Sequence, residues 1–243
     1  MEIGFPPSAG ACVFGAGGGI GGALVDALAA MPGIARIDAG ARTAPADAGC
    51  VHGFAFDLED EATIAAAAER LAASPPRLVI VATGLLHAAG MAPEKSLRMQ
   101  SADAYARAFA INTIGPALIA KHVLPLLPRR GRTVFAVLSA RVGSIADNRL
   151  GGWHAYRASK AALNMVVRNL AIETARTHPE AVVAALHPGT VATGLSAPFR
   201  GRVPPERLFT PATAAAHLLR VIGALTPADS GGLFAWDGQR IAF

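Results

Sequence analysis

The chain has 243 residues, of which 52% are hydrophobic and 16% charged, and its formal net charge is +5. This length and composition suit one large α/β domain over residues 1–243 and exclude a disordered chain. The positive charge comes from scattered arginines with no basic run, so we expect an anionic small ligand and no nucleic-acid partner.

The N-terminal segment and the cysteines exclude further classes of protein. Pro6 and Pro7 interrupt the N-terminus before an apolar signal segment can form, and no apolar run reaches the length of a membrane span. Cys12 and Cys50 have neither metal-ligand spacing nor the pattern of a disulfide framework. We therefore expect a cytoplasmic protein with no membrane partner and no metal site.

The first expected strand leads directly into a glycine-rich turn. Residues 11–14 are apolar, and a helix with apolar residues at spacings of four and three follows the turn. Strand, glycine turn and helix are the context that a dinucleotide-binding loop requires, because glycines let the backbone approach a pyrophosphate at the helix N-terminus. The alternative is a plain glycine-rich turn. The candidate binding residues are Gly15, Gly17, Gly18, Gly19, Ile20 and Gly21.

The end of the second strand, residues 34–42, bears on the choice of cofactor. An NAD-binding site usually carries an acid at this tip, which accepts a hydrogen bond from the ribose 2′-hydroxyl. Here the tip is Ala41 followed by Arg42, and a guanidinium pairs well with a 2′-phosphate. Asp38 is the competing acid, but it lies mid-strand and is expected to face elsewhere. The sequence therefore favours NADP over NAD.

Strands and helices alternate along the rest of the chain. We expect strands at residues 53–56, 78–82, 133–138, 182–186 and 233–236, and helices at residues 60–73, 101–127, 211–225 and from Tyr156 onward. The strand at 78–82 is apolar throughout, as in the buried centre of a parallel sheet. Residues 194–205 contain prolines and show no helical periodicity. This alternation predicts one doubly wound α/β domain without a linker or repeat.

Tyr156 and Lys160 are the candidate proton-transfer pair. Their spacing of four residues places them one turn apart on the same helix face. A phenol has an ordinary pKa of about 10, and a nearby ammonium lowers it by favouring the phenolate. Such a pair can act as a general acid or base at a carbonyl or an alcohol. The alternative is a tyrosine and a lysine that merely share a helix face.

Five motifs in order make the chain resemble the short-chain dehydrogenase/reductase (SDR) family from end to end. They include Gly15-x-x-x-Gly19-Ile20-Gly21, Asp57-Leu58, Asn112, Tyr156-x-x-x-Lys160 and Pro188-Gly189-x-Val191-x-Thr193. Residues 151–164 resemble the C-factor-like branch of that family. The resemblance implies a Rossmann-type doubly wound parallel sheet with strand order 3-2-1-4-5-6-7 and helices on both faces. It also implies a nicotinamide cofactor and, commonly, a homodimer or homotetramer.

The resemblance also implies roles for the matching residues. Tyr156 would donate a proton to a substrate carbonyl or accept one from an alcohol. Lys160 would lower the pKa of Tyr156 and bond the nicotinamide ribose, and Asn112 would help to hold a water in a proton relay. The cofactor would lie against the glycine loop and Arg42, and further against Asp57, Leu58, Thr83, Gly84, Asn112, Tyr156, Lys160, Pro188, Gly189, Val191 and Thr193.

The chain departs from the family pattern at the catalytic serine. The family places this serine three residues before a glycine in the turn after the fifth strand, and counting back from Gly143 gives Ala140. Ser139 is one position early and by strand alternation should point to the opposite face. Ser144 lies in the following loop and could swing in. Either serine is a candidate for the catalytic site, and either could be an ordinary loop serine.

Two functions remain open. The first is an NADP-dependent oxidoreductase, most simply one that reduces a small apolar carbonyl compound with Tyr156 as proton donor. The second is a nicotinamide-binding protein with weakened chemistry that works through partners or in signalling. The retained tyrosine, lysine and Asn112 favour the enzyme, and the missing serine favours the binder. The substrate pocket is expected between residues 85–100 and 194–205, with a mainly apolar wall of Leu85, Leu86, Met91, Leu195 and Phe199.

Overall fold

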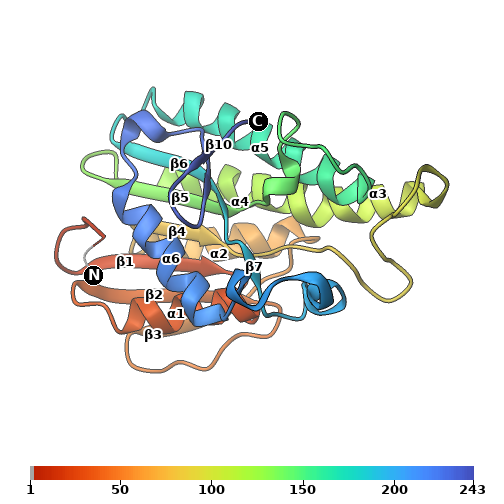
Figure 1. Ribbon diagram of the computed structural model, residues 1–243. Coiled ribbons are helices and arrows are strands. Elements are labelled where there is room, and N and C mark those ends of the chain that lie inside the picture. Colours follow the sequence, from red (N-terminus) through yellow and green to blue (C-terminus); the bar gives the residue numbers. More distant parts are fainter. Residues whose placement is uncertain (1–2) are drawn as a thin grey trace.

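A computed structural model describes residues 3–243, and an eight-stranded sheet forms its centre (Figure 1). In the order β3-β2-β1-β4-β5-β6-β9, the strands are parallel neighbours, and β10 joins β9 in antiparallel orientation at the edge. The expected order of seven strands is therefore confirmed, and β10 is an addition that the sequence did not predict. The bounds are β1 (Ala9–Phe14), β2 (Ile34–Ala41), β3 (Val51–Ala55), β4 (Leu78–Val81), β5 (Thr133–Leu138), β6 (Ala181–His187), β9 (Leu233–Ala235) and β10 (Arg240–Ile241).

Helices cover both faces of the sheet, as expected for a doubly wound fold. On one face α1 (Gly19–Ala29) and α6 (Pro211–Ala224) lie side by side, and Leu24, Leu28, Leu218 and Leu219 pack on Val13 and Ile80 of the strands (Figure 1). On the other face α2 (Glu61–Ala72), α4 (Gly115–Val123) and α5 (His154–Thr174) bury a second apolar cluster around Phe14 and Phe135.

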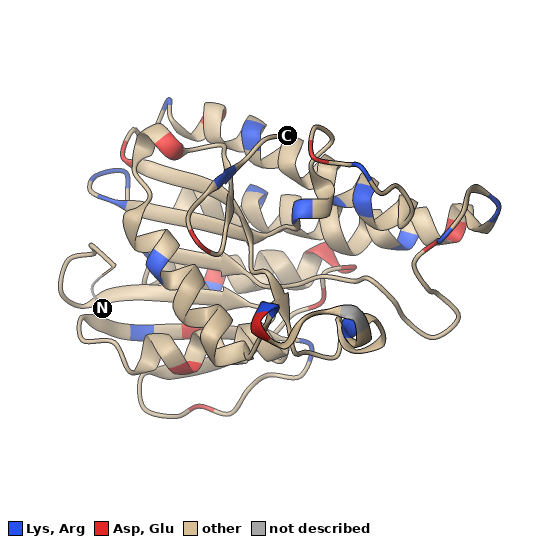
Figure 2. Ribbon diagram, viewed as in Figure 1, with Lys and Arg blue, Asp and Glu red and all other residues tan. Residues whose placement is uncertain are grey.

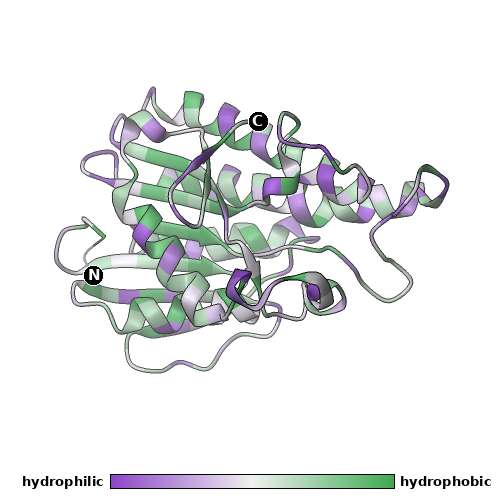
Figure 3. Cartoon of the chain, in the orientation of Figure 1, coloured by the Kyte–Doolittle hydropathy of each residue, from purple (hydrophilic) through white to green (hydrophobic). Residues whose placement is uncertain are grey.

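The central strands are buried on both faces, which explains their continuous apolar sequence. Every residue of β4 and β5 is buried. Colouring by hydropathy shows these strands as mostly hydrophobic, with hydrophilic residues towards the outer helix faces and the loops (Figure 3). Lysine, arginine, aspartate and glutamate likewise lie mainly on helices and loops around the sheet (Figure 2). Two-sided burial leaves no room for polar side chains until each strand ends.

The long helix expected over residues 101–127 is interrupted. It consists of α3 (Ala102–Phe109), a π-helical turn (Ala110–Ile114), α4 and a final 3-10 turn (Leu124–Leu126). Pro116 lies in the first turn of α4, where its missing amide proton costs no helical hydrogen bond. The π-helical turn holds Asn112, and such turns insert an extra residue into the helix.

The same helical run bears on the membrane expectation. Taken as one helix, Ala102–Leu126 is long and apolar enough to cross a bilayer by length and composition alone. This differs from the expectation that no apolar run reaches that length. The observation is weak evidence for a membrane span, because core helices of soluble proteins pass the same test. Here Ile119, Ala120 and Val123 are buried in the core beneath α2 and α5.

The segment after β6 is more structured than its sequence suggests. Residues 194–205 were expected to lack helix, but 3-10 turns form at Ala197–Arg202 and Pro205–Arg207. A short parallel pair, β7 (Thr190–Val191) and β8 (Leu208–Phe209), closes the base of this segment. The rings of Phe209, His217 and Trp236 pack together behind it, with centroids 4.7–5.0 Å apart. This aromatic cluster fixes the segment at the edge of the sheet.

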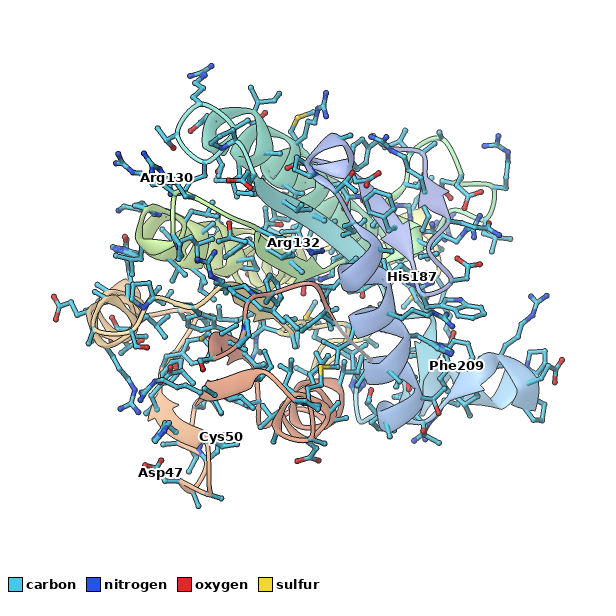
Figure 4. All side chains as sticks on the ribbon, turned by 90° about the vertical axis from the view of Figure 1, so that its left-hand side faces the viewer. Asp47, Cys50, Arg130, Arg132, His187 and Phe209 are labelled. Atoms are coloured by element: carbon cyan, nitrogen blue, oxygen red, sulfur yellow. The ribbon has the colours of Figure 1, made fainter. Side chains whose placement is uncertain are left out.

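Arg132 ties the N-terminal segment to the end of α6. Its Nη2 donates to the carbonyls of Ile222 at 2.5 Å and Leu225 at 3.0 Å, and its Nη1 donates to the carbonyl of Ile3 at 3.4 Å. The guanidinium also lies 5.3 Å from the ring centroid of Phe5. Figure 4 shows Arg132 near the middle of this end of the molecule and Arg130 towards its periphery. The cation therefore satisfies carbonyls that the helix end leaves without partners.

We expect Arg132→Met to lower the free energy of unfolding by about 2–3 kcal/mol, because it leaves the two carbonyls of α6 without a donor. Arg130→Met is the matched control, since the Arg130 side chain is exposed, and should change that energy by less than about 0.5 kcal/mol. Urea unfolding followed by circular dichroism measures both. Equal midpoints for the two variants would contradict the role given to Arg132.

Candidate active site

The glycine loop makes a close contact between the end of β1 and the start of α1. Gly15 has φ +95°, a conformation that favours glycine. A Cβ on Gly21 would lie 2.0 Å from the carbonyl oxygen of Gly15, so only glycine fits there. The N-terminus of α1 is thereby held against the loop, with its free amide groups directed at the space that a pyrophosphate needs. The structure brings together all six loop residues expected from the sequence.

A groove of about 540 Å³ runs along the carboxyl ends of the strands from this loop. Its wall includes eight of the eighteen expected cofactor residues, namely Gly15, Gly17, Gly18, Arg42, Asp57, Leu58, Thr83 and Gly84. Thr43, Phe56, Arg107 and Ile111 also line it and were not expected from the sequence. The hydroxyl of Thr83 is buried without a hydrogen-bond partner among the described residues. A buried orphan hydroxyl in a glycine-lined groove fits a polar ligand such as a dinucleotide.

The second strand carries an acid that is engaged within the fold, Asp38, and a cation at its tip that has no ion pair among the described residues, Arg42. Asp38 is buried and binds Arg36 in a two-pronged ion pair at 2.7 and 2.8 Å, with Arg70 at 3.3 Å. Asp38 is thus engaged inside the fold, as its mid-strand position suggested. Arg42 is exposed on the groove wall, and no carboxylate lies within 4.0 Å of it in residues 3–243. Its guanidinium therefore remains available to an anionic group of a ligand.

Asn112 is held in the π-helical turn by a complete set of hydrogen bonds. Its Oδ1 accepts from the amide of Leu85 at 2.8 Å, and its Nδ2 donates to the carbonyl of Leu85 at 2.8 Å and to Ser159 Oγ at 3.1 Å. The side chain is fully buried. Asn112 therefore joins the strand-exit loop after β4 to α5, directly beside the residues that carry the candidate chemistry.

Tyr156 and Lys160 lie on one face of α5 and are both buried. Lys160 Nζ donates to the carbonyl of Leu138 at 2.8 Å and lies 6.0 Å from the centroid of the Tyr156 ring. Burial raises the pKa of Tyr156 to about 12 and lowers the pKa of Lys160 to about 7. The expected lowering of the tyrosine pKa is therefore not found: desolvation favours the neutral form of both groups. At neutral pH the phenol keeps its proton.

Neither serine candidate has a free hydroxyl facing Tyr156. Ser139 donates to Asn164 Oδ1 on α5 at 2.7 Å. Ser144 donates to the carbonyl of Ala242 and accepts from the amide of Asp147, so the C-terminal segment engages it. Ala140 occupies the position that packs against Tyr156 and Leu86. Both hydroxyls thus donate to partners other than Tyr156, and Ser139 lies on the wall of the cavity that Tyr156 also lines.

A second cavity of about 230 Å³ adjoins the Tyr156 side chain and is mainly apolar. Leu86, Leu195 and Phe199 line it, as expected from the sequence. Leu85 instead lines the dinucleotide groove, and Met91 lies in neither wall but in a bridge with Ala88. Further lining residues are Ile20, Val142, Trp153, Pro188, Gly189, Val191, Thr193 and Val203. The cavity is sized for a small organic molecule.

His187 is a polar residue of this cavity that the sequence did not single out. It ends β6, and its Nδ1 is buried without a partner in the described part of the chain. Burial, with Arg141 nearby, lowers the pKa of His187 to about 4. The ring is therefore neutral at physiological pH and offers one donor and one acceptor. Its position directly before the Pro188-Gly189 motif is the feature by which the sequence could have identified it.

Residues 3–243 contain no group of three or more His, Cys, Asp or Glu side chains placed to hold a metal ion. The polar groups at this edge are instead a phenol, an amine, an imidazole and an amide. They are suited to proton transfer and hydrogen bonding at an uncharged substrate.

The shifted pKa of Lys160 predicts a pH dependence of stability. Between its folded value of about 7 and its ordinary value of about 10.4, the unfolded chain binds a proton that the folded chain does not. The free energy of unfolding therefore rises with pH in this window, by at most about 1.4 kcal/mol per unit from this group. Lys160→Met should flatten that rise. Urea unfolding at pH 6.5–8.5, with no ligand added, measures both slopes.

The control concerns Cys12, whose thiol pKa is raised by burial and which gives a contribution of opposite sign above about pH 8.5. Both proteins contain Cys12, so the difference between their slopes isolates Lys160. Parallel curves would contradict a neutral lysine in the folded chain.

Comparison with known proteins gives the family. The model of the short chain dehydrogenase family matches residues 9–203. A dehydrogenase of Rhodococcus sp., named for 1-hydroxy-2-glutathionyl-2-methyl-3-butene, is 35% identical over 182 residues, which are 75% of this chain and 76% of the relative. C-signal of Myxococcus xanthus is 37% identical over 137 residues, 56% of this chain and 76% of C-signal, in agreement with the expected C-factor-like branch.

Solved structures agree with the fold. The NADPH-bound carbonyl reductase from chicken fatty liver superposes with a TM-score of 0.85 at 25% identity, covering 100% of this chain and 97% of that one. Carbonyl reductase Sniffer of D. melanogaster superposes with a TM-score of 0.83 at 21% identity, covering 98% and 100%. With the family match over most of its length, the chain is a member of the short-chain dehydrogenase/reductase family, an oxidoreductase family.

Proposed function

We propose that the chain is an NADPH-dependent reductase of small, apolar carbonyl compounds. The observation that carries this proposal is the Tyr156 side chain, which lines an apolar cavity of about 230 Å³ beside the dinucleotide groove. A bound NADPH supplies a hydride. The structure of the NADPH-bound carbonyl reductase from chicken supports this cofactor and this reaction.

Three residues have assigned tasks in this proposal. Tyr156 donates the proton from its hydroxyl to the carbonyl oxygen, and its raised pKa keeps that proton in place at neutral pH. Lys160 supports the phenol and bonds the ribose. Asn112 holds the loop after β4 against α5, which keeps the groove and the cavity in a fixed position relative to each other.

The cofactor preference rests on Arg42. With Ala41 at the strand tip and Asp38 engaged by Arg36 and Arg70, Arg42 is a cation at this tip that is free to meet a 2′-phosphate. NADPH should therefore bind more tightly than NADH. Arg42→Ala should narrow this gap by about 1.5–3 kcal/mol, the value of a charge-assisted hydrogen bond. Titration of nicotinamide fluorescence measures both affinities. Equal affinity in the unaltered protein would contradict the assignment.

The role of Tyr156 is tested by removing one oxygen. Tyr156→Phe keeps the ring and the helix but removes the proton donor, so turnover of a panel of aldehydes and ketones should fall by about 10²–10⁴-fold. NADPH affinity should change little. Tyr105→Phe is the matched control: it removes the hydroxyl of a half-buried tyrosine that bonds Gln100, and it should keep full activity. Turnover that survives Tyr156→Phe would rule out this mechanism.

The second function is a nicotinamide-binding protein with weakened chemistry that acts through partners. The specific observation in its favour is Ala140 at the serine position, with Ser139 and Ser144 both engaged elsewhere. Under this alternative NADPH binds tightly, and neither the unaltered protein nor Tyr156→Phe turns over any carbonyl in the panel. The same experiment therefore separates the two functions.

We further propose a homodimer or homotetramer that uses α5. Met165 and Ile172 are exposed on one face of this helix, with side chains 62% and 48% accessible, and Ile114 of the neighbouring turn is 51% accessible. Exposed apolar residues on adjacent elements suit a symmetric interface. Sedimentation velocity at micromolar concentration should show the oligomer, and Met165→Glu with Ile172→Glu should yield monomers. A monomer from the unaltered chain would refute the proposal, and Ala216→Glu, at an exposed position of α6 on the opposite face of the sheet, is the charge control.

A further inference from the structure

Glu94 is a buried carboxylate that the proposed reaction does not use. It lies on the loop between β4 and α3, where its side chain is part of a residue only 2% exposed. No lysine, arginine or histidine side chain that the structure describes lies within 4.0 Å of it. Its Oε1 and Oε2 lie 3.4 and 3.3 Å from the amide nitrogen of Ala155. A buried anion is thus held at the first turn of the helix that carries Tyr156.

The first turn of α5 depends on Glu94 because it has no local cap. The N-cap residue is Trp153, which has φ 50° and ψ 44° and whose side chain caps no amide. In most helices a serine, threonine or aspartate at this position bonds the amide two or three residues on. Here the Glu94 carboxylate meets the amide of Ala155, which is that position. A distant loop therefore does the work of the missing cap.

The backbone of Glu94 fixes the same turn. Its carbonyl accepts from the amide of Trp153 at 2.5 Å. Gly152, with φ +64°, passes close to that carbonyl, and a Cβ there would lie 3.3 Å from the oxygen. The left-handed conformation of Trp153, uncommon for a bulky residue, is therefore maintained by contacts from both sides.

This conformation directs the indole into the cavity wall. The Trp153 ring lies 6.3 Å from the ring of Tyr156 and 5.2 Å from that of Phe199, measured between centroids. Phe199 in turn meets the ring of His87 at 5.9 Å. The indole thus connects the tyrosine on α5 with the segment after β6, and its direction depends on the turn that Glu94 holds.

We propose that Glu94 is a positioning residue, which caps α5 from a separate loop and thereby sets Trp153 and Tyr156 at the walls of the carbonyl cavity. The proposal rests on the proposed reduction for its kinetic test. It assigns the loop between β4 and α3 a second task beyond lining the site. This loop fixes the geometry of the tyrosine helix.

Steady-state kinetics test the positioning role. Glu94→Ala should lower kcat/KM for the carbonyl by about 10- to 100-fold, because a reacting group displaced by about 1 Å can lose rate on this scale. Glu94→Gln keeps an acceptor oxygen at the same distance and should stay within about threefold of the unaltered enzyme. Glu94→Asp withdraws the carboxylate and should fall between them. The Kd for NADPH should stay within about twofold in all three variants.

Two results would overturn the proposal. If Glu94→Asp and Glu94→Gln lose equal activity, the position of the acceptor oxygen does not determine activity. This comparison can be made even if Glu94→Ala does not fold. If Glu94→Ala changes stability alone, with kcat and KM unchanged, Glu94 is a structural residue only. Lys95→Ala, an exposed change in the same loop, is the matched control and should leave every value unchanged.

A fluorescence measurement tests the inference without any turnover. The chain has two tryptophans, so Trp236→Phe leaves Trp153 as the sole emitter. In this background Glu94→Ala should red-shift the emission and increase quenching by acrylamide about twofold or more, and Glu94→Gln should restore the parent values. Unchanged quenching in Glu94→Ala would contradict the proposal. If no carbonyl is turned over but this shift is seen, the proposed reduction fails and the positioning of Trp153 stands.

Discussion

The central strands of this protein are buried on both faces, and that constraint decides where chemistry can take place. A polar side chain inside β4 or β5 would lose its hydration without gaining a partner. Polar groups therefore begin where the strands end, with Thr83 after β4, Ser139 after β5 and His187 at the last position of β6. Because these strands are parallel, their carboxyl ends meet at one edge of the sheet.

Burial at this edge also sets the charge of the site. Tyr156, Lys160 and His187 are each shifted towards the neutral form, and desolvation is the largest cause for all three. Charge persists instead at the exposed tip of β2, where Arg42 stands on the groove wall. The site is thus divided into a neutral part, suited to an uncharged carbonyl, and a cationic part, suited to a phosphate.

Much of this arrangement could be predicted from the sequence. The alternation of strands and helices followed from apolar runs, and the groove followed from Gly15 to Gly21, because these patterns report local backbone needs; the strand order followed from the resemblance to the family. The short strand β10 and the 3-10 turn at Ala197–Arg202 could not be predicted, since neither has a periodic pattern. Motif spacing identified Ala140 as the departure from the family.

Tertiary contacts decided what spacing left open. Ser144 is engaged by the carbonyl of Ala242, and Ser139 by Asn164, and both partners lie far along the chain. Glu94 has the same character, because its role depends on an amide at the start of α5. The opposite direction of the tyrosine pKa shift arises likewise, since desolvation is a property of the assembled core and not of the spacing to Lys160.

The π-helical turn at Ala110–Ile114 changes the direction in which the residues after it face about the helix axis, relative to the residues before it. Each residue of an α-helix rotates the chain by about 100°, so one additional residue turns everything beyond it onto a different face. Asn112 can therefore face Leu85 and Ser159 while Ile119 and Val123, further on, face the core. If the turn were one residue shorter, the helix would be regular. The Asn112 side chain could then not face Leu85 while Ile119 and Val123 face the core. The irregular turn is what allows one continuous rod to serve both the site and the core.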